Sequence, residues 1–361
     1  MKIAFICGPL DYGGAGKIIK FVANGLVEAG IDVSIFSLWQ KERPVSLSQT
    51  ISFESRNYEK KSRLPWRFSE IRDIREFIIK TKADIVCPFV SDIVFLTKIA
   101  TLGLKNFALV PAERGDPYTL PGKWKPLVRW AYTGSDYGIF QLKKQGEFFG
   151  EELMKRSYVI PNPFVPSCDI NNADINRNKT IVTAGRFDYQ KGFDVLIKAF
   201  AIVTKIHPEY KLIINGSGPL KDDYVALSKE LGIDGLIEYP GYVNDVAYSV
   251  KDEGIFVLPS RFEGIPNALI EAMSTGIPTI SADCTPGGPD FLTSSGKRGL
   301  LVKVDDVKGT AAAINYFIEN PDVARQYGCR GQEIVSELEP SKILDLWIIT
   351  FKDIYKRYNS K

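Results

Sequence analysis

The chain has 361 residues, of which 45% are apolar and 25% charged, so it is long enough for two domains that each bury a core. No apolar run reaches the length of a membrane span, and the first one, Lys2–Cys7, is too short for a signal-peptide core. Residues 1–165 carry a net charge of +7 and the remainder −4, which favours an anionic partner, such as a membrane surface, for the first half. Basic and aromatic residues do not interleave as in a nucleic-acid platform, so no nucleic acid is expected.

The first half alternates short apolar runs with amphipathic stretches. Helices are predicted at residues 16–29, 68–81 and 93–100. A polar stretch at residues 169–179 is predicted to link the two halves. The predicted strands of this half are Lys2–Cys7, Asp32–Leu38, Asp84–Cys87, Phe107–Val110 and Tyr158–Ile160.

The same alternation restarts after the linker, with helices predicted at residues 193–206 and 342–358. It predicts an α/β fold of two Rossmann-like domains, whose parallel sheets face a central cleft. Because ligands bind beyond the carboxyl ends of parallel strands, residues that follow strands are the functional candidates. The strands predicted here are Thr180–Gly185, Lys211–Asn215, Ile237–Tyr239, Gly254–Leu258, Ile277–Ala282 and Gly299–Val302.

The most informative stretch contains Glu263 and Glu271, one in a predicted loop and one in the helix that follows it. Pro266 suits the first turn of that helix, where its missing N–H costs nothing. The free N–H groups of Asn267 and Ala268, together with the helix dipole, predict an anion site between the two carboxylates. A ligand with a phosphate in the middle and hydroxyls at both ends suits this arrangement, and a nucleotide sugar is such a ligand.

Two cations follow the strand that ends at Gly185. Arg186 and Lys191 can hold a diphosphate there and stabilise it as it leaves, although two surface charges flanking a loop would show the same pattern. Gly216 lies in a Gly-Ser-Gly segment after the next strand, where it permits close backbone approach to a ligand or forms a plain turn. Tyr242 follows a further strand, in a segment whose backbone can lie against the edge of a nucleobase.

In the first half, a Gly-Gly-Ala-Gly segment follows the first strand and opens the first helix. It matches neither a Walker loop nor a dinucleotide fingerprint. The remaining hypothesis is that the bare backbone at Gly13 and Gly14 approaches a diphosphate, with Lys17 as a candidate on the acceptor side.

A charged cluster follows the predicted strand Phe107–Val110. Glu113, Arg114 and Asp116 should therefore face the cleft. Glu113 and Asp116 are candidates for acceptor contacts.

Cysteine and histidine usage argues against metal and histidine chemistry. The five cysteines are scattered, odd in number and without metal-ligand spacing, which favours a reduced cytoplasmic protein. The single histidine, His207, is expected at a solvent-exposed helix end, so histidine catalysis and a zinc site are not expected. No metal ion and no cofactor are predicted.

Several tryptophans lie near basic residues in the first half. They predict either a basic and aromatic surface at a membrane interface, or partly buried tryptophans beside solvated cations. The residues are Trp66, Arg67, Trp124 and Trp130, with Lys60, Lys61, Arg63, Lys123, Lys125 and Arg129 nearby.

Together these residues resemble the retaining GT-B glycosyltransferases of glycosyltransferase family 4, also called group 1 transferases, and in particular the capsule and exopolysaccharide type. The resemblance spans essentially the whole chain, including the early Gly-Gly and the long final helix. It implies an acceptor-binding domain at residues 1–165, a nucleotide-sugar-binding domain at 166–340, and a helix at 341–361 that packs back on the first domain. Its strongest parts are the Glu-x7-Glu of Glu263 and Glu271, the Gly-Arg-x4-Lys-Gly of Gly185 to Gly192, and the Asn-Gly-x-Gly of Asn215 to Gly218.

By this resemblance, Glu263 binds hydroxyls of the donor sugar and Glu271 binds the ribose. Arg186 and Lys191 hold the diphosphate without a metal ion, and the departing phosphate oxygen takes the acceptor's proton in a front-face substitution. The expected donor is a UDP-sugar, and the expected acceptor is a glycan, lipid-linked at the inner face of the cell membrane, in bacterial surface polysaccharide synthesis.

One segment departs from the family pattern. Many members carry a histidine that contacts the sugar or phosphate near the position of Arg114, whereas this chain reads Glu-Arg-Gly-Asp-Pro there. By the resemblance, Arg114 is expected to make that donor contact. Three alternatives stay open on the same fold: a nucleotide-sugar epimerase, a phosphorylase, and a non-catalytic partner subunit.

Overall fold

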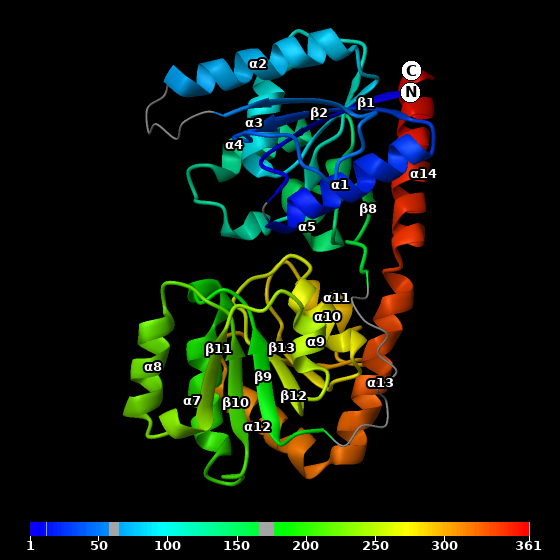
Figure 1. Cartoon of the computed structure of the whole chain (residues 1–361). Coiled ribbons are helices and arrows are strands. Elements are labelled where there is room, and N and C mark those ends of the chain that lie inside the picture. The colour runs from blue at the N-terminus through cyan, green and yellow to red at the C-terminus, as the bar shows by residue number, and fades with distance from the viewer. Residues whose placement is uncertain (12, 58–64, 166–176, 361) are drawn as a thin grey trace. The chain divides into compact units, whose positions relative to one another are not determined.

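The computed structural model describes residues 1–11, 13–57, 65–165 and 177–360. They form two compact units: Met1–Pro163 with Pro340–Lys361, called unit 1, and Phe164–Glu339, called unit 2 (Figure 1). Most of the predicted linker, residues 169–176, lies outside the described residues. Among the described helices, none combines the length and hydropathy that a membrane-crossing segment needs.

Unit 1 contains parallel strands throughout, in a sheet of order β3-β2-β1-β4-β5 and a second of order β6-β7-β8. A bridge between Phe89 and Ala112 connects the end of β4 with β6. The strands are β1 (Lys2–Cys7), β2 (Asp32–Leu38), β3 (Ser52–Arg56), β4 (Ile85–Pro88), β5 (Ala108–Leu109), β6 (Ala112–Glu113), β7 (Gly138–Phe140) and β8 (Ser157–Val159).

The helices of unit 1 pack in two groups, with α2 against α3 and α1 against the final helix α14. Gly25 permits the second contact, because a Cβ atom there would lie 2.4 Å from Leu344 of α14. The helices are α1 (Gly13–Glu28), α2 (Pro65–Thr81), α3 (Ser91–Ala100), η1 (Pro117–Thr119), α4 (Lys125–Thr133), α5 (Lys143–Phe149), α6 (Glu151–Met154) and α14 (Pro340–Asn359).

Three strands of unit 1 were not predicted. β3 is a partly exposed edge strand with polar residues, and β6 and β7 have only two and three residues, so none of them shows a clear apolar pattern. Helix α1 also begins at Gly13, three residues before its predicted start, because a helix's first N–H groups need no partner within the helix. Gly16 lies inside α1, where a Cβ would meet the carbonyl oxygen of Leu10 at 2.6 Å.

Unit 2 is a single six-stranded parallel sheet of order β11-β10-β9-β12-β13-β14. Every strand predicted here is present, with its ends within two residues of the prediction. The strands are β9 (Thr180–Ala184), β10 (Lys211–Asn215), β11 (Ile237–Gly241), β12 (Ile255–Leu258), β13 (Thr279–Ala282) and β14 (Leu300–Val302).

Helices cover both faces of this sheet, with α7 contacting α8 and α12, and α10 contacting α9 and α13 (Figure 1). The core beneath α7 includes Phe193, Leu196 and Phe200, all fully buried. Each such side chain stabilises the unit by about 1.5–3 kcal/mol. The helices are η2 (Tyr189–Lys191), α7 (Phe193–Val203), α8 (Lys221–Glu230), η3 (Asp234–Leu236), α9 (Val246–Val250), α10 (Asn267–Ser274), α11 (Gly288–Leu292), α12 (Val307–Glu319) and α13 (Pro321–Glu337).

The expectation that His207 is solvent-exposed is wrong. Its side chain is only 16% exposed, and its Nε2 lies 3.8 Å from Glu319 of α12. The ring also makes an edge contact with Tyr210. The segment after α7 therefore folds back onto neighbouring elements, which local sequence does not reveal.

Candidate functional site

The loops that follow β9 and β10 and the end of β11 are joined to one another at the carboxyl edge of the unit 2 sheet. Phe187 donates its backbone N–H to the carbonyl of Ser217 at 2.8 Å, and Gly216 donates to the carbonyl of Gly241 at 2.7 Å. Tyr242, the next residue after β11, has 74% of its surface exposed. The strand-end loops therefore form one connected surface rather than separate turns.

Two glycines make this loop packing sterically possible. Gly216 has φ 142°, and a Cβ there would lie 1.8 Å from the carbonyl oxygen of Gly185. Gly218 has φ 154°, and its Cβ would lie 2.6 Å from the carbonyl oxygen of Phe187. Both positions therefore need glycine for contact between loops, and the proposed approach of Gly216 to a ligand stays a prediction.

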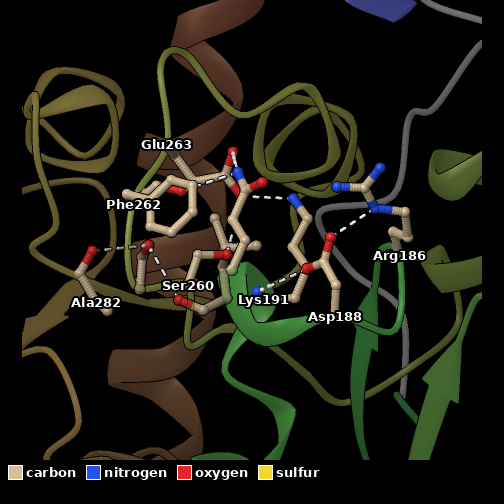
Figure 2. A network of polar contacts seen from close by, with 10 residues as sticks. Arg186, Asp188, Lys191, Ser260, Phe262, Glu263 and Ala282 are labelled. Carbon is tan, nitrogen blue, oxygen red and sulfur yellow. Dashed lines mark hydrogen bonds and ion pairs between the residues drawn. The ribbon is translucent and has the colours of Figure 1, made fainter. Parts of the chain in front are cut away.

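Lys191 and Glu263 form an ion pair that joins the loops after β9 and β12 (Figure 2). Their side chains are 16% and 9% exposed. Ser260 Oγ donates to Glu263 Oε1 at 2.9 Å, and Gln190 Nε2 contacts Oε2 at 3.4 Å. The carboxylate of Glu263 thus accepts from a cation, a hydroxyl and an amide, and its position is determined by all three.

Arg186 lies on the same loop as Lys191 but in a different environment. Its side chain is 72% exposed, and its Nε donates to Asp188 Oδ2 at 2.5 Å. Asp188 also caps η2 by accepting the backbone N–H of Lys191 at 3.3 Å (Figure 2). One cation is therefore covered and the other faces solvent.

Among the described residues, no group of three or more His, Cys, Asp and Glu side chains is placed to hold a metal ion.

Helix α10 begins between the two glutamates. Pro266 precedes the first helical residue, one position earlier than predicted, and Asn267 and Ala268 form the start of the helix. Their N–H groups come before the first intrahelical hydrogen bonds, so they suit an anion. Glu271 follows in the second turn, and its Oε2 accepts the backbone N–H of Val246 at 3.1 Å, which ties α10 to the start of α9.

In unit 1, the carboxylate of Glu113 is enclosed, with only 1% of the residue exposed. Oε2 accepts from the hydroxyl of Ser91 and from that of Tyr132, the latter at 2.7 Å. Oε1 accepts the backbone N–H groups of Arg114 at 2.9 Å and Gly115 at 2.8 Å. Glu113 thus organises its own loop, and its predicted acceptor contact stays a prediction.

The guanidinium of Arg114 contacts other residues of unit 1. Nη1 donates to the carbonyl of Ile160 at 2.9 Å, and the group lies 4.8 Å from the ring centroid of Trp347. Nε and Nη2 are buried without a hydrogen-bond partner. Burial lowers the pKa of Arg114 to about 10, so the group remains a cation at neutral pH. Its predicted contact with the donor also stays a prediction.

The other predicted residues of unit 1 lie on α1 and η1. Gly13 and Gly14 form the first turn of α1, and Lys17, one turn later, is exposed. Asp116 caps η1 by accepting the N–H of Tyr118 at 2.9 Å.

Three residues at the site were not singled out from the sequence. Ser260 and Gln190 contact Glu263, and Arg261 joins the loops behind the ion pair. Their only sequence signal is their position inside the motifs that carry Lys191 and Glu263. Nothing in residue type or spacing distinguishes them from loop residues exposed to solvent.

Solved structures establish the fold class. The lipopolysaccharide outer core galactosyltransferase WaaB superimposes with a TM-score of 0.75 and 21% identity, over 98% of this chain and 99% of its own. Anabaena HepE, solved with UDP, superimposes with a TM-score of 0.76 and 18% identity, over 98% of this chain and 100% of its own. The chain has the GT-B fold, which confirms the predicted fold class.

Sequence comparison agrees with this class. Residues 169–334 match the family model of group 1 glycosyl transferases. An α-1,4-N-acetyl-D-galactosaminyltransferase of Campylobacter jejuni, named for an acceptor on diNAcBac-PP-undecaprenol, is 25% identical over 356 residues, which cover 96% of this chain and 97% of the relative. Relatives of this chain are thus glycosyltransferases of bacterial polysaccharide and lipid-linked glycan synthesis.

The contact between the loops after β9 and β12 can be tested at Gly192, with Gly232 as a matched control. The two glycines have φ values of 63° and 69°, but a Cβ would lie 2.2 Å from the carbonyl oxygen of Pro259 at Gly192 and meet nothing within 4 Å at Gly232. The left-handed backbone costs an alanine about 1–2 kcal/mol at either position. We expect Gly192→Ala to lower the free energy of unfolding in urea by about 1–3 kcal/mol more than Gly232→Ala. Equal losses would contradict the tight contact.

Proposed function

We propose that this protein is a retaining glycosyltransferase that moves a sugar from a UDP-sugar to a lipid-linked glycan in bacterial surface polysaccharide synthesis. The observation that carries the proposal is the covered Lys191–Glu263 ion pair, beside exposed Arg186 and the start of α10. This edge combines cations for a diphosphate with carboxylates for hydroxyls. Relatives that are named as transferases favour this function over an epimerase, a phosphorylase or a non-catalytic subunit.

The proposed donor site uses the two ends of this edge differently. Arg186, Lys191 and the first N–H groups of α10 bind the diphosphate. Glu263 accepts hydrogen bonds from the sugar hydroxyls, and Glu271 accepts them from the ribose. The assignment of Glu271 to the ribose is supported by the Val246 N–H, which holds the Glu271 carboxylate in place. A carboxylate can accept hydrogen bonds from several donors at once.

Further contacts of the proposed donor lie in unit 2, where Tyr242 and Gly216 border the nucleotide. The UDP in the HepE structure supports a uridine nucleotide for this chain by analogy.

In the proposed reaction, the bond between the sugar C1 and the diphosphate oxygen breaks, and the acceptor hydroxyl forms its bond to C1 on the same face. The departing oxygen gains negative charge, which Lys191 and Arg186 stabilise, and then takes the proton of the acceptor hydroxyl. No side-chain base is needed. Glu263 suits a scheme without a side-chain base, because its carboxylate already accepts contacts from Lys191, Ser260 and Gln190.

The donor assignment is tested by UDP binding. We expect UDP to raise the melting temperature of the protein, and Glu271→Ala to weaken UDP binding about 10- to 150-fold, since a charge-assisted bond is worth about 1.5–3 kcal/mol. Glu230→Ala on α8 is an exposed glutamate control. Unchanged affinity in Glu271→Ala would exclude the ribose contact.

Turnover and stereochemistry are tested separately. Incubation with UDP-sugars should release sugar and UDP slowly. NMR of the transfer product should show the donor's anomeric configuration, and an inverted product would exclude retention.

The leaving-group role is tested by turnover. We expect Lys191→Gln to lower kcat by about 100-fold, with a smaller effect on donor affinity, because charge develops only as the diphosphate departs. Arg186→Ala should act in the same direction without a folding cost, since its side chain is 72% exposed. Exposed Lys198 on α7 provides the control Lys198→Ala. Full turnover in both Lys191→Gln and Arg186→Ala would rule out this role.

A lipid-linked acceptor also implies contact between unit 1 and a membrane. Helix α4 exposes 43% each of Leu127 and Trp130, next to exposed Lys123 and Arg129. Trp124 and Trp130 both pack edge-on against Phe95, but Trp124 is half-buried. Of the other residues predicted for this surface, Lys60, Lys61 and Arg63 lie outside the described residues.

We therefore propose that α4 contacts anionic lipid. Binding to phosphatidylglycerol vesicles should fall with added salt and in Trp130→Ala, because the contact combines charge attraction with an aromatic anchor. Tyr316→Ala removes an aromatic residue that is 44% exposed in unit 2 and serves as the control. Equal binding to neutral phosphatidylcholine vesicles would contradict the proposal.

A further inference from the structure

Arg261 lies two residues before Glu263, in the loop after β12, yet it does not contact the ion pair itself. Its side chain is only 11% exposed. Arg186, in comparison, has 72% of its side chain exposed. The contacts of Arg261 are instead with three neighbouring segments of unit 2.

Those contacts use all three nitrogens of the guanidinium. Nη1 donates to the carbonyl of Tyr189, Nη2 to Asp194 Oδ2 and Nε to Asp305 Oδ1, each at 2.8 Å. The guanidinium also lies 4.2 Å from the ring centroid of Tyr189. The backbone N–H of Arg261 donates to the carbonyl of Gln190 at 2.7 Å. Arg261 therefore connects η2, the first turn of α7 and the loop before α12.

The segment that Arg261 holds is the one that carries Lys191. Tyr189 and Gln190 are the two residues before it, and Asp194 lies three residues after it. On the other side, Gln190 Nε2 donates to the carbonyl of Phe262 at 2.9 Å. The contacts with Tyr189, Gln190 and Asp194 thus restrain Lys191 relative to the loop of Glu263.

The charge of Arg261 is used within the protein. Burial opposes its ionisation, but the hydrogen bond and charge of Asp194, followed by the charge of Asp305, outweigh this effect and raise the pKa of Arg261. With two carboxylates as partners, Arg261 adds little positive potential for a diphosphate. Its contribution is geometric, because a planar guanidinium fork fixes the direction of each of its hydrogen bonds.

We propose that Arg261 is a positioning residue for sugar transfer, which holds the η2 segment so that Lys191 meets both Glu263 and the departing diphosphate. This inference rests on the proposed role of Lys191 in the transferase reaction. Arg261 itself touches neither substrate nor reacting atoms. Its loss leaves both cations of the site in the chain but releases the loop that places one of them.

The experiment is a double-mutant cycle in the full-length protein with Arg261→Gln and Lys191→Gln. Arg261→Gln should lower kcat by about 10- to 100-fold, since small misplacements of catalytic groups have effects of this size. In the Lys191→Gln background, the same change should lower kcat by less than about twofold, because residues that act as a unit are not additive. Arg261→Lys should recover only part of the rate, since lysine lacks the fork.

Arg298→Gln is the matched control. Arg298 is 15% exposed and pairs with Glu333 and Glu337 on α13, with Nε at 3.2 Å from Glu333 and Nη2 at 2.5 Å from Glu337. The substitution Arg298→Gln therefore removes an arginine of similar burial and pairing from another part of unit 2. Its effect on kcat should be small and the same in both backgrounds.

Hydrogen–deuterium exchange gives a readout that does not depend on turnover. Amides of residues 186–192 should exchange faster in Arg261→Gln than in the parent, and at the parent rate in Arg298→Gln. Unchanged exchange in this segment would overturn the inference, as would an equal loss of kcat from Arg261→Gln in both backgrounds. A normal kcat in Lys191→Gln alone would instead overturn the proposed role of Lys191, so the two failures are distinguishable.

Discussion

The ion pair between Lys191 and Glu263 is largely withdrawn from water, and the carboxyl edge of the unit 2 sheet is built around this constraint. Taking two such charges out of solvent costs several kcal/mol each, which their attraction offsets only with good geometry and further hydrogen bonds. Ser260 and Gln190 supply those hydrogen bonds to Glu263, and Arg261 holds the backbone on the opposite side. The two loops that carry the charges can therefore not be repositioned independently.

The same edge depends on close contacts between backbones. Because neighbouring parallel strands end at one edge of the sheet, their loops meet there, and side chains would keep them apart. Gly192, Gly216 and Gly218 remove that obstacle, each at a place where a Cβ would overlap the backbone of another loop. A rigid set of loops suits the proposed transfer reaction, since a leaving group is stabilised best by charges that are in place before the reaction.

Much of this arrangement could be predicted from local sequence. The strands of unit 2 were predictable because each is a short apolar run, and the two glutamates follow from their positions before and within a helix. The role of Glu113 could not be predicted in this way. Its burial depends on Ser91 and Tyr132, which are 22 and 19 residues away in the chain. A charged residue after a strand has the same local pattern whether it faces a ligand or organises its own loop.

The sequence by itself determined the fold class, the order of the strands along the chain and the motifs that carry Arg186, Lys191, Glu263 and Glu271. These depend on short-range periodicity and on spacing within one loop and helix. Tertiary structure alone decided which charges pair and which face solvent. Lys191 and Glu263 are 72 residues apart, and the sheet order, in which β9 lies beside β12, brings them together. Pairing between distant segments leaves no periodic signal, because it is set by the packing of strands rather than by neighbours in the chain.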